Sequence, residues 1–244
     1  MKIYGKNPCL EYLKSKEGTV DSLKVQIGLK DNLSNTIIRL ARESGAKISF
    51  LKREILDREQ KNHQGFIMET SDFKYSEVSD ILNVAKERRE DPFIIILDEI
   101  NDPHNLGAII RTAECCGVHG IIIPKNRSVF VNETVVKVST GATSYVKIAK
   151  VVNIASTIEQ LKEQNIFVYA LEKGGDNIYK TNLKGPVAFV VGSEGAGIRA
   201  LNKKVCDDMI SIPEFGKINS LNASVACAVT AYEIRRQRGN FWTN

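Results

Sequence analysis

Short apolar runs alternate with amphipathic segments along the chain, and the pattern changes near residue 92. Beyond it, the continuous apolar runs Phe93–Leu97 and Val187–Val191 predict buried parallel strands, because a strand covered on both faces has no polar side. Helical periodicity marks Leu106–Cys116 and Thr157–Gln164 between the strands. Further strands are expected at Gly120–Ile123, Tyr145–Ile148 and Ile166–Leu171, and a further helix at Glu133–Ser139. Strands alternating with helices predict an α/β fold with a parallel sheet.

The first part of the chain has a smaller α/β pattern of its own. Helices are expected at Lys6–Ser15 and from an N-capping Asn32 to Gly45. Strands are expected at Ser22–Ile27, Lys47–Leu51 and Gly65–Glu69. His63, in the charged stretch before the last strand, is interpreted as a surface or turn residue. Because 76–92 becomes sharply polar, we predict domains at 1–75 and 93–244 joined by a charged linker at 76–92 that includes at most one or two helical turns.

Composition is that of a soluble globular protein, since 43% of the 244 residues are hydrophobic and 26% are charged. The sequence contains no apolar run long enough to span a membrane, and the N-terminal residues lack the apolar stretch of a signal peptide. We therefore expect a cytoplasmic protein. The net charge of +5 permits an anionic partner such as RNA without establishing one.

The cysteines and histidines offer little chemistry. There are five cysteines, an odd number, and none forms a C-x-x-C pair. Cys115 and Cys116 fall inside an apolar helical pattern, where thiols behave as small hydrophobes. The three histidines are scattered, so we expect no metal site and five reduced, structural cysteines.

Three polar loops follow predicted strands, and the first runs from Asp98 to Arg111. Asn105 is a candidate helix N-cap. Arg111 is open to two interpretations: an ordinary exposed helix arginine, or a cation that folds back over Gly107 toward Asn105.

The second loop contains Gly192, Gly195 and Gly197 directly after a predicted strand, where glycine lets the backbone approach a ligand. The G-x-x-G-x-G spacing matches neither the dinucleotide fingerprint nor the P-loop. Glu194 would repel a phosphate, so a nucleotide-like ligand without phosphates at this point fits better.

The third loop is Ser211–Asn222, where an apolar run stops at Pro213 and Asn222 is placed to cap the following helix. The extra polar residues Lys217, Asn219 and Ser220 are consistent with a ligand loop or with a solvated connection. Because ligands in open α/β sheets bind beyond the carboxyl ends of the strands, we expect the three loops to converge on one site.

The motifs in these loops carry a family resemblance. Asn105-x5-Arg111, Gly192-Ser-Glu-Gly, and Ser211-Ile-Pro with Ser220-Leu-Asn222 resemble the three motifs of the SpoU (TrmH-type) RNA 2′-O-ribose methyltransferases. The front domain, from Ile3-Tyr-Gly-Lys-Asn-Pro to Asn62-His-Gln-Gly, resembles the L30e-like RNA-binding domain of the group that methylates a guanosine of 23S rRNA.

The resemblance implies a SPOUT fold with a C-terminal trefoil knot, an S-adenosylmethionine cofactor bound in the knot, an RNA substrate, and a homodimer formed through the knotted domain. It assigns cofactor binding to Gly192, Ile212 and Leu221, with Thr140 and Gly141 in a neighbouring pocket segment. The positions implied to be catalytic or substrate-positioning are Asn105, Arg111, Glu194, Ser220 and Asn222.

Arg111 is the general base proposed for this family, but a guanidinium remains protonated far above neutral pH. We therefore expect Arg111 to hold an RNA phosphate and to orient the ribose 2′-hydroxyl. Three alternatives remain: a tRNA substrate, a non-catalytic RNA-binding protein of ribosome assembly, and an oxidoreductase, which the missing fingerprint disfavours. The basic tail Arg235–Arg238 is interpreted as suiting a helix C-terminus rather than RNA, and Trp242 is a candidate dimer contact.

Overall fold

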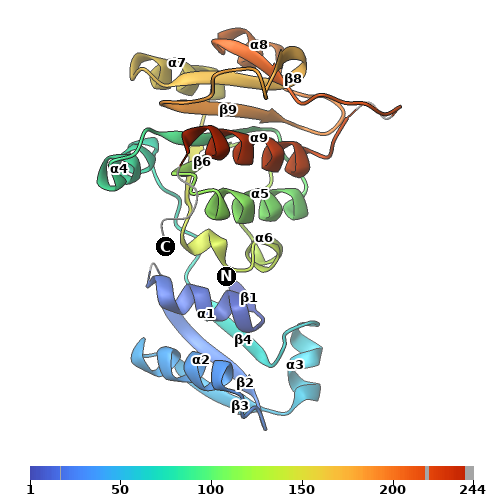
Figure 1. Cartoon of the computed structure of the whole chain (residues 1–244). Coiled ribbons are helices and arrows are strands. Elements are labelled where there is room, and N and C mark those ends of the chain that lie inside the picture. The colour runs from blue at the N-terminus through green and yellow to red at the C-terminus, as the bar shows by residue number, and fades with distance from the viewer. Residues whose placement is uncertain (17, 218–219, 240–244) are drawn as a thin grey trace. The chain divides into compact units, whose positions relative to one another are not determined.

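The computed structural model describes residues 1–16, 18–217 and 220–239, which form two compact units (Figure 1). The first unit comprises Met1–Lys74 and Phe130–Tyr145, and the second comprises Tyr75–Val129 and the chain from Val146 onward. The segment 130–145 thus belongs with the front of the chain, although it lies within the predicted rear domain.

The first unit contains a four-stranded sheet in the order β1-β4-β2-β3, in which β2 is parallel to β3 and antiparallel to β4. Leu23 and Val25 of the second strand are fully buried, as the predicted alternation requires. The strands are β1 Lys2–Tyr4, β2 Val20–Gln26, β3 Lys47–Leu51 and β4 Phe66–Thr70. The helices are α1 Lys6–Ser15, α2 Asn32–Glu43, α3 Arg53–Glu59, α6 Glu133–Val138 and the 3-10 turn η1 Ala142–Ser144.

One local prediction in this unit was wrong. Asp31, not Asn32, caps α2, and its carboxylate accepts from Ser34 N at 3.0 Å and pairs with Lys6 Nζ at 2.7 Å. His63, predicted to be a surface or turn residue, lies in the turn before β4 and is buried. Its Nδ1 accepts from Gly65 N at 2.8 Å, and its Nε2 lies 3.0 Å from the Asp57 carboxylate, so the ring organises the turn before β4.

The second unit is built on a six-stranded sheet in the order β10-β8-β9-β5-β6-β7, with every pairing parallel. This confirms the predicted parallel α/β sheet. The strands are β5 Phe93–Asp98, β6 Gly120–Pro124, β7 Lys147–Val151, β8 Phe167–Asn177, β9 Val187–Gly192 and β10 Asp208–Ser211. The helices are α4 Val78–Arg88, α5 Pro103–Cys115, α7 Ile154–Glu163, α8 Ala200–Val205 and α9 Ala223–Arg238.

Helices cover both faces of this sheet (Figure 1). Side chains of α4 and α7 pack with alternate residues of the central strands, including Ile94, Ile96 and Val190, in one apolar core. The helices α5 and α9 contact each other and cover the opposite face. Within the stretch predicted to be a linker, α4 is a three-turn helix whose Ile81 and Leu82 join that core.

The C-terminal chain returns from the sheet edge toward its middle. After the edge strand β10 it passes back to α9, which packs against β9 and α5. This return is the segment that the resemblance predicts to thread a knot. Arg238 fixes the end of α9, since its guanidinium donates to the carbonyls of Asp91, Pro92 and Gly185 at 2.6–2.8 Å. Phe241 and Trp242 lie outside the described residues.

Candidate functional site

The site is anchored at the carboxyl ends of β5 and β9, where Asp98 and Gly192 are register partners. Asp98 is fully buried, and its carboxylate accepts from Arg199 N at 2.9 Å, Arg199 Nε at 2.7 Å and Asn202 Nδ2 at 2.8 Å. A buried carboxylate needs such partners to offset its loss of hydration. These bonds fix the far end of the loop 192–199, called here the glycine loop, against β5.

The glycine loop closes on itself. Ser193 and Gly197 exchange backbone hydrogen bonds of 3.2 and 3.0 Å, and Gly195 and Gly197 adopt positive φ angles of 85° and 68°. A Cβ added to Gly192 would lie 2.1 Å from the carbonyl carbon of Gly197, which is backbone and cannot rotate away. Gly192 is therefore required for the loop to fold back beside the strand.

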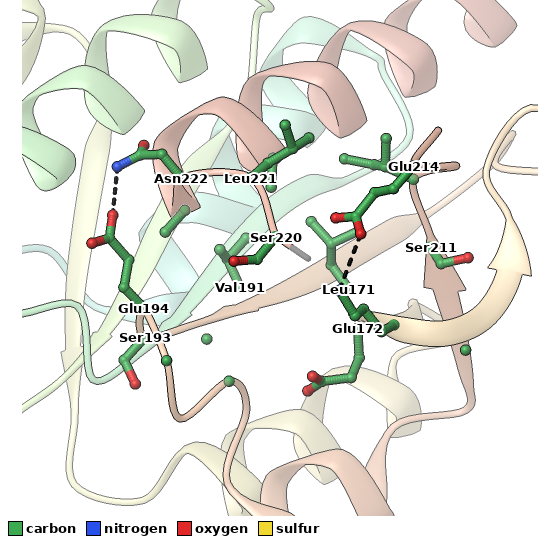
Figure 2. Close-up of a pocket in the computed structure, with 18 of the residues that line it drawn as sticks. Leu171, Glu172, Val191, Ser193, Glu194, Ser211, Glu214, Ser220, Leu221 and Asn222 are labelled. Atoms are coloured by element: carbon green, nitrogen blue, oxygen red, sulfur yellow. Dashed lines mark hydrogen bonds and ion pairs between the residues drawn. The ribbon is translucent and has the colours of Figure 1, made fainter. Parts of the chain in front are cut away.

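A cavity of about 820 Å³ opens beside this loop (Figure 2). Its walls come from the ends of β8, β9 and β10 and from the start of α9, so segments far apart in sequence share it. Six of the predicted site residues line it: Gly192, Glu194, Ile212, Ser220, Leu221 and Asn222. Apolar side chains from Leu171, Val191 and Ile212 form much of its wall.

Asn105, Glu194 and Asn222 form one hydrogen-bonded cluster. Asn105 Nδ2 donates to Glu194 Oε1 at 2.9 Å, and Asn222 Nδ2 donates to Asn105 Oδ1 at 3.0 Å. Asn222 Nδ2 also donates to Glu194 Oε1, and Figure 2 shows this contact at the edge of the cavity. Three loops separated by up to 117 residues in sequence therefore meet at one point.

Helix capping sets the orientation of Asn222. Its Oδ1 accepts from Ser224 N at 2.9 Å and Val225 N at 3.3 Å, which confirms it as the N-cap of α9. Because the oxygen faces the helix, the amide nitrogen must face Glu194. Among the described residues, Oε2 of Glu194 has no hydrogen-bond partner, so this oxygen is available to a ligand.

The prediction that Asn105 caps α5 was wrong. Asp102 is the N-cap and accepts from His104 N at 2.9 Å, with Pro103 as the first helical residue. Asn105 lies inside the first turn and is buried. Because Asp102 caps the helix, the amide of Asn105 is free to bond Glu194 and Asn222.

Three other predicted residues are placed differently. Arg111 is exposed on α5, does not line the cavity, and makes no hydrogen bond or ion pair with the described residues. Thr140 and Gly141 belong to the first unit and do not line the cavity. A Cβ on Gly141 would lie 2.7 Å from Glu11 Cβ of that unit, so this glycine serves close packing there.

The cavity also holds two carboxylates that sequence reasoning missed, Glu172 and Glu214. Glu172 accepts from Ile198 N at 3.3 Å, and Glu214 pairs with Lys173 Nζ at 3.1 Å. The sequence pattern ended the strand at Leu171, whereas β8 continues to Asn177 and carries Glu172 into the wall. With Glu194, these two groups place three carboxylates in a partly apolar cavity, although Lys203 pairs with Glu172 at 3.6 Å and Lys173 also lines the wall.

Neither a reactive thiolate nor a metal cluster is found in the described part of the chain. Burial raises the pKa of the Cys9, Cys116 and Cys206 thiols to about 12, so they remain protonated at neutral pH. No group of three or more His, Cys, Asp and Glu side chains there is arranged to hold a metal ion. None of its helices is both long and apolar enough to cross a bilayer.

Two family models match the sequence. That of the SpoU rRNA methylase family matches residues 92–232, and that of the substrate-binding domain of RNA 2′-O ribose methyltransferases matches residues 2–76. The two matches fall on either side of α4.

Two curated relatives match over nearly their whole length. YacO of Bacillus subtilis, whose name assigns it provisionally to the TrmH family of tRNA/rRNA methyltransferases, is 40% identical over 97% of this chain and 95% of its own. The 23S rRNA (guanosine-2′-O-)-methyltransferase RlmB of Photorhabdus laumondii is 36% identical over 98% of each chain. The SpoU methyltransferase AviRb of Streptomyces viridochromogenes, solved with AdoMet, superposes with a TM-score of 0.83 over 98% of this chain and 90% of its own. At 22% identity, that likeness shows the fold alone.

Proposed function

This chain belongs to the SpoU rRNA methylase family, and from that premise we propose that it methylates a ribose 2′-hydroxyl of a guanosine in 23S rRNA with S-adenosylmethionine. The observation that carries the proposal is the meeting of Asn105, Glu194 and Asn222 at the edge of the 820 Å³ cavity. We place the activity in the cytoplasm.

The cavity fits the proposed cofactor. S-adenosylmethionine has an apolar and aromatic body and a positive sulfonium, with no phosphate. Gly192, Ile212 and Leu221 provide backbone and apolar surface for the body, and Glu194, which has no lysine or arginine partner among the described residues, provides negative charge. When bound, the cofactor would supply an electrophilic methyl group to which the ribose oxygen forms a bond as the carbon–sulfur bond breaks, with the hydroxyl proton released.

The residues of this chain position the ribose. Oε1 of Glu194 is held by the amides of Asn105 and Asn222, which leaves Oε2 to accept a hydrogen bond from the 2′-hydroxyl. Ser220 lies on the same wall, within the segment that ends at Asn222, and offers a hydroxyl to the same sugar. Holding the nucleophile in one geometry contributes much of the rate in such a displacement.

Arg111 is proposed to hold a phosphate next to the reacting nucleotide. Its exposed guanidinium is unpaired among the described residues, as a phosphate ligand requires, and a guanidinium is a poor general base. We expect Arg111→Lys to lower kcat by at least tenfold with little change in S-adenosylmethionine affinity, because the ammonium lacks the planar fork. Single-turnover kinetics and calorimetry check this; near-normal turnover would contradict a bidentate role.

The first unit is proposed to bind the RNA. It contains a groove of about 800 Å³ lined by the basic side chains Lys6, Arg53 and Lys61 together with Asn62 and Gln64. Cationic and amide groups of this kind contact phosphates and unpaired bases. Comparing methylation of 23S rRNA fragments with methylation of tRNA tests the substrate, and methylation of tRNA alone would assign the alternative.

A homodimer through the second unit is also proposed. Val225 and Tyr232 lie two turns apart on α9, so they share a face, and they are 46% and 54% exposed. Exposed apolar side chains grouped on one helix face are typical of an interface. Light scattering measures the mass directly, and a monomer at micromolar concentration would contradict this proposal.

A non-catalytic function can be distinguished from the methyltransferase function by cofactor binding. A non-catalytic RNA-binding protein of ribosome assembly would bind RNA without binding S-adenosylmethionine. Calorimetry with the purified protein therefore separates the two functions, and the absence of cofactor binding would overturn the methyltransferase proposal.

A further inference from the structure

A second group of charged residues lies beyond the carboxyl ends of the same parallel strands, outside the cavity. Glu99 follows β5, Arg127 follows β6, and Arg199 precedes α8. Oε1 of Glu99 lies 3.7 Å from Arg127 Nη1 and 3.4 Å from Arg199 Nη1. This oxygen is buried and makes no hydrogen bond, so Glu99 holds the two guanidinium groups by charge alone.

The loop that carries Arg127 is held in a strained conformation. Glu99 and Arg127 both have left-handed backbones, with φ angles of 61° and 58°. Residues other than glycine adopt this region at a cost, and such strain concentrates at functional sites. Ser128 Oγ donates to Ile100 O at 3.0 Å, and Val129 N donates to the same oxygen at 2.9 Å. The two loops are therefore locked together, which fixes the backbone that presents Arg127.

Arg127 is the more exposed of the two guanidinium groups that Glu99 holds. Asp98 is occupied by Arg199 and Asn202, and Asp102 caps α5. The Arg127 side chain is 76% exposed, compared with 42% for Arg199. Lys125 on the same loop is exposed as well and adds to the positive charge.

We propose that Arg127 binds a backbone phosphate of the RNA beside the nucleotide whose ribose reaches the Asn105–Glu194–Asn222 cluster. This inference rests on the proposed function and deepens it. The strands β5 and β6 are adjacent and parallel, so their carboxyl ends lie side by side. Arg127, which follows β6, therefore lies one strand away from the loop that leads from β5 to Asn105. A guanidinium can bind two phosphate oxygens at once, and the long contact with Glu99 is readily exchanged for such a ligand.

Two variants test this site in the full-length protein. Arg127→Gln removes the charge and keeps much of the length. Arg127→Gly removes the side chain and suits a φ of 58°, so it folds even if the first variant does not. Both are expected to raise KM for an rRNA fragment three- to tenfold, with kcat and S-adenosylmethionine affinity unchanged. The dependence of log(kcat/KM) on log salt concentration should become shallower by about 0.7, the value for one single-strand phosphate contact.

The matched control is Arg88→Gln. Arg88 is exposed in the same unit and precedes β5, so it lies toward the amino ends of the strands, away from the site. Its loss should leave both the KM and the salt slope unchanged. Wild-type values of KM and salt slope in Arg127→Gln and Arg127→Gly would overturn the inference, as would a fall in kcat at constant KM.

Failure of the proposed function is distinguishable from failure of this inference. If the wild-type protein methylates no RNA, the proposed function fails, and fluorescence anisotropy of a labelled rRNA fragment still measures the binding slope. A wild-type slope in the Arg127 variants by that measurement would overturn the phosphate site independently of catalysis.

Discussion

At the scale of single residues, one side chain can serve both the fold and the site. Asn222 uses its oxygen to cap α9 and its nitrogen to bind Glu194, so the helix fixes the position of a polar group at the cavity. Asn105, in contrast, does not cap its helix. Its side chain reaches Glu194 because Asp102 provides the cap of α5.

These two roles of Asn222 can be separated by substitution. Serine caps helices about as well as asparagine but lacks the amide donor, so Asn222→Ser should change the free energy of unfolding by less than about 0.5 kcal/mol. Its kcat should fall at least tenfold, or about 1.4 kcal/mol, because Glu194 loses one of its two partners. Chemical denaturation and single-turnover assays measure the two effects.

Asn153→Ser is the matched control for this change. Asn153 caps α7 by accepting from Ser156 N at 3.2 Å, and it does not line the cavity. The control should retain both stability and activity. A fully active Asn222→Ser variant would show that the amide contact with Glu194 is not needed for turnover.

At the scale of elements, the end of β9 and the glycine loop that follows it are held together. The glycine loop folds back on β9, and Asp98 secures its far end through Arg199 and Asn202. The close approach occurs at Gly192, where the loop backbone leaves no space for a Cβ.

Gly192→Ala is therefore expected to disrupt the loop. The new methyl group would overlap the backbone of Gly197 and Ile198, at a cost of about 1–3 kcal/mol for an overpacked site. We expect a lower melting temperature and at least tenfold weaker S-adenosylmethionine binding by calorimetry.

Gly195→Ala provides the comparison within the same loop. A Cβ there meets open space, so its cost comes only from the positive φ of 85°. Calorimetry should show that it weakens cofactor binding less than Gly192→Ala. Equal effects at the two positions would indicate that backbone strain, rather than the clash, governs the loop.

At the scale of the whole molecule, stability should depend on pH through His119. This residue is 1% exposed; its Nδ1 accepts from Phe93 N at 2.9 Å, and its Nε2 lies 3.2 Å from a Glu90 oxygen. Burial lowers the pKa of His119 to about 4, an effect that the nearby Glu90 carboxylate only partly opposes. The neutral ring is therefore the form that the folded protein favours.

The sign of the dependence follows from this lowered pKa. Between about pH 6.5 and 4 the unfolded chain binds a proton at this histidine and the folded chain does not, so stability falls as the pH falls. Denaturant titrations at pH 7 and pH 4.5 should show a smaller loss in His119→Asn, whose Oδ1 can still accept from Phe93 N. An identical pH dependence in this variant would assign the effect to other groups.

The sequence by itself determined most of the secondary structure and the identity of the loops. Continuous apolar runs located β5 and β9, because burial on both faces leaves no polar position in a central strand. The motifs at Asn105, Glu194 and Asn222 identified the residues of the cluster, whose roles in turnover remain predictions. Local patterns assigned the wrong N-cap to α2 and α5, where neighbouring polar residues compete to cap the helix. They also underestimated the length of α4, whose charged residues cover a buried stripe.

Only the tertiary structure decided which groups meet. The hydrogen bonds from Asn105 and Asn222 to Glu194 join residues 89 and 28 positions apart, and no periodicity in the chain encodes such a contact. The extension of β8 that carries Glu172 into the cavity, and the pairing of Glu99 with Arg127 and Arg199, likewise arise from the order of strands in the sheet. A sequence records the preference of each segment for its local structure, whereas a site depends on the packing that brings the segments together.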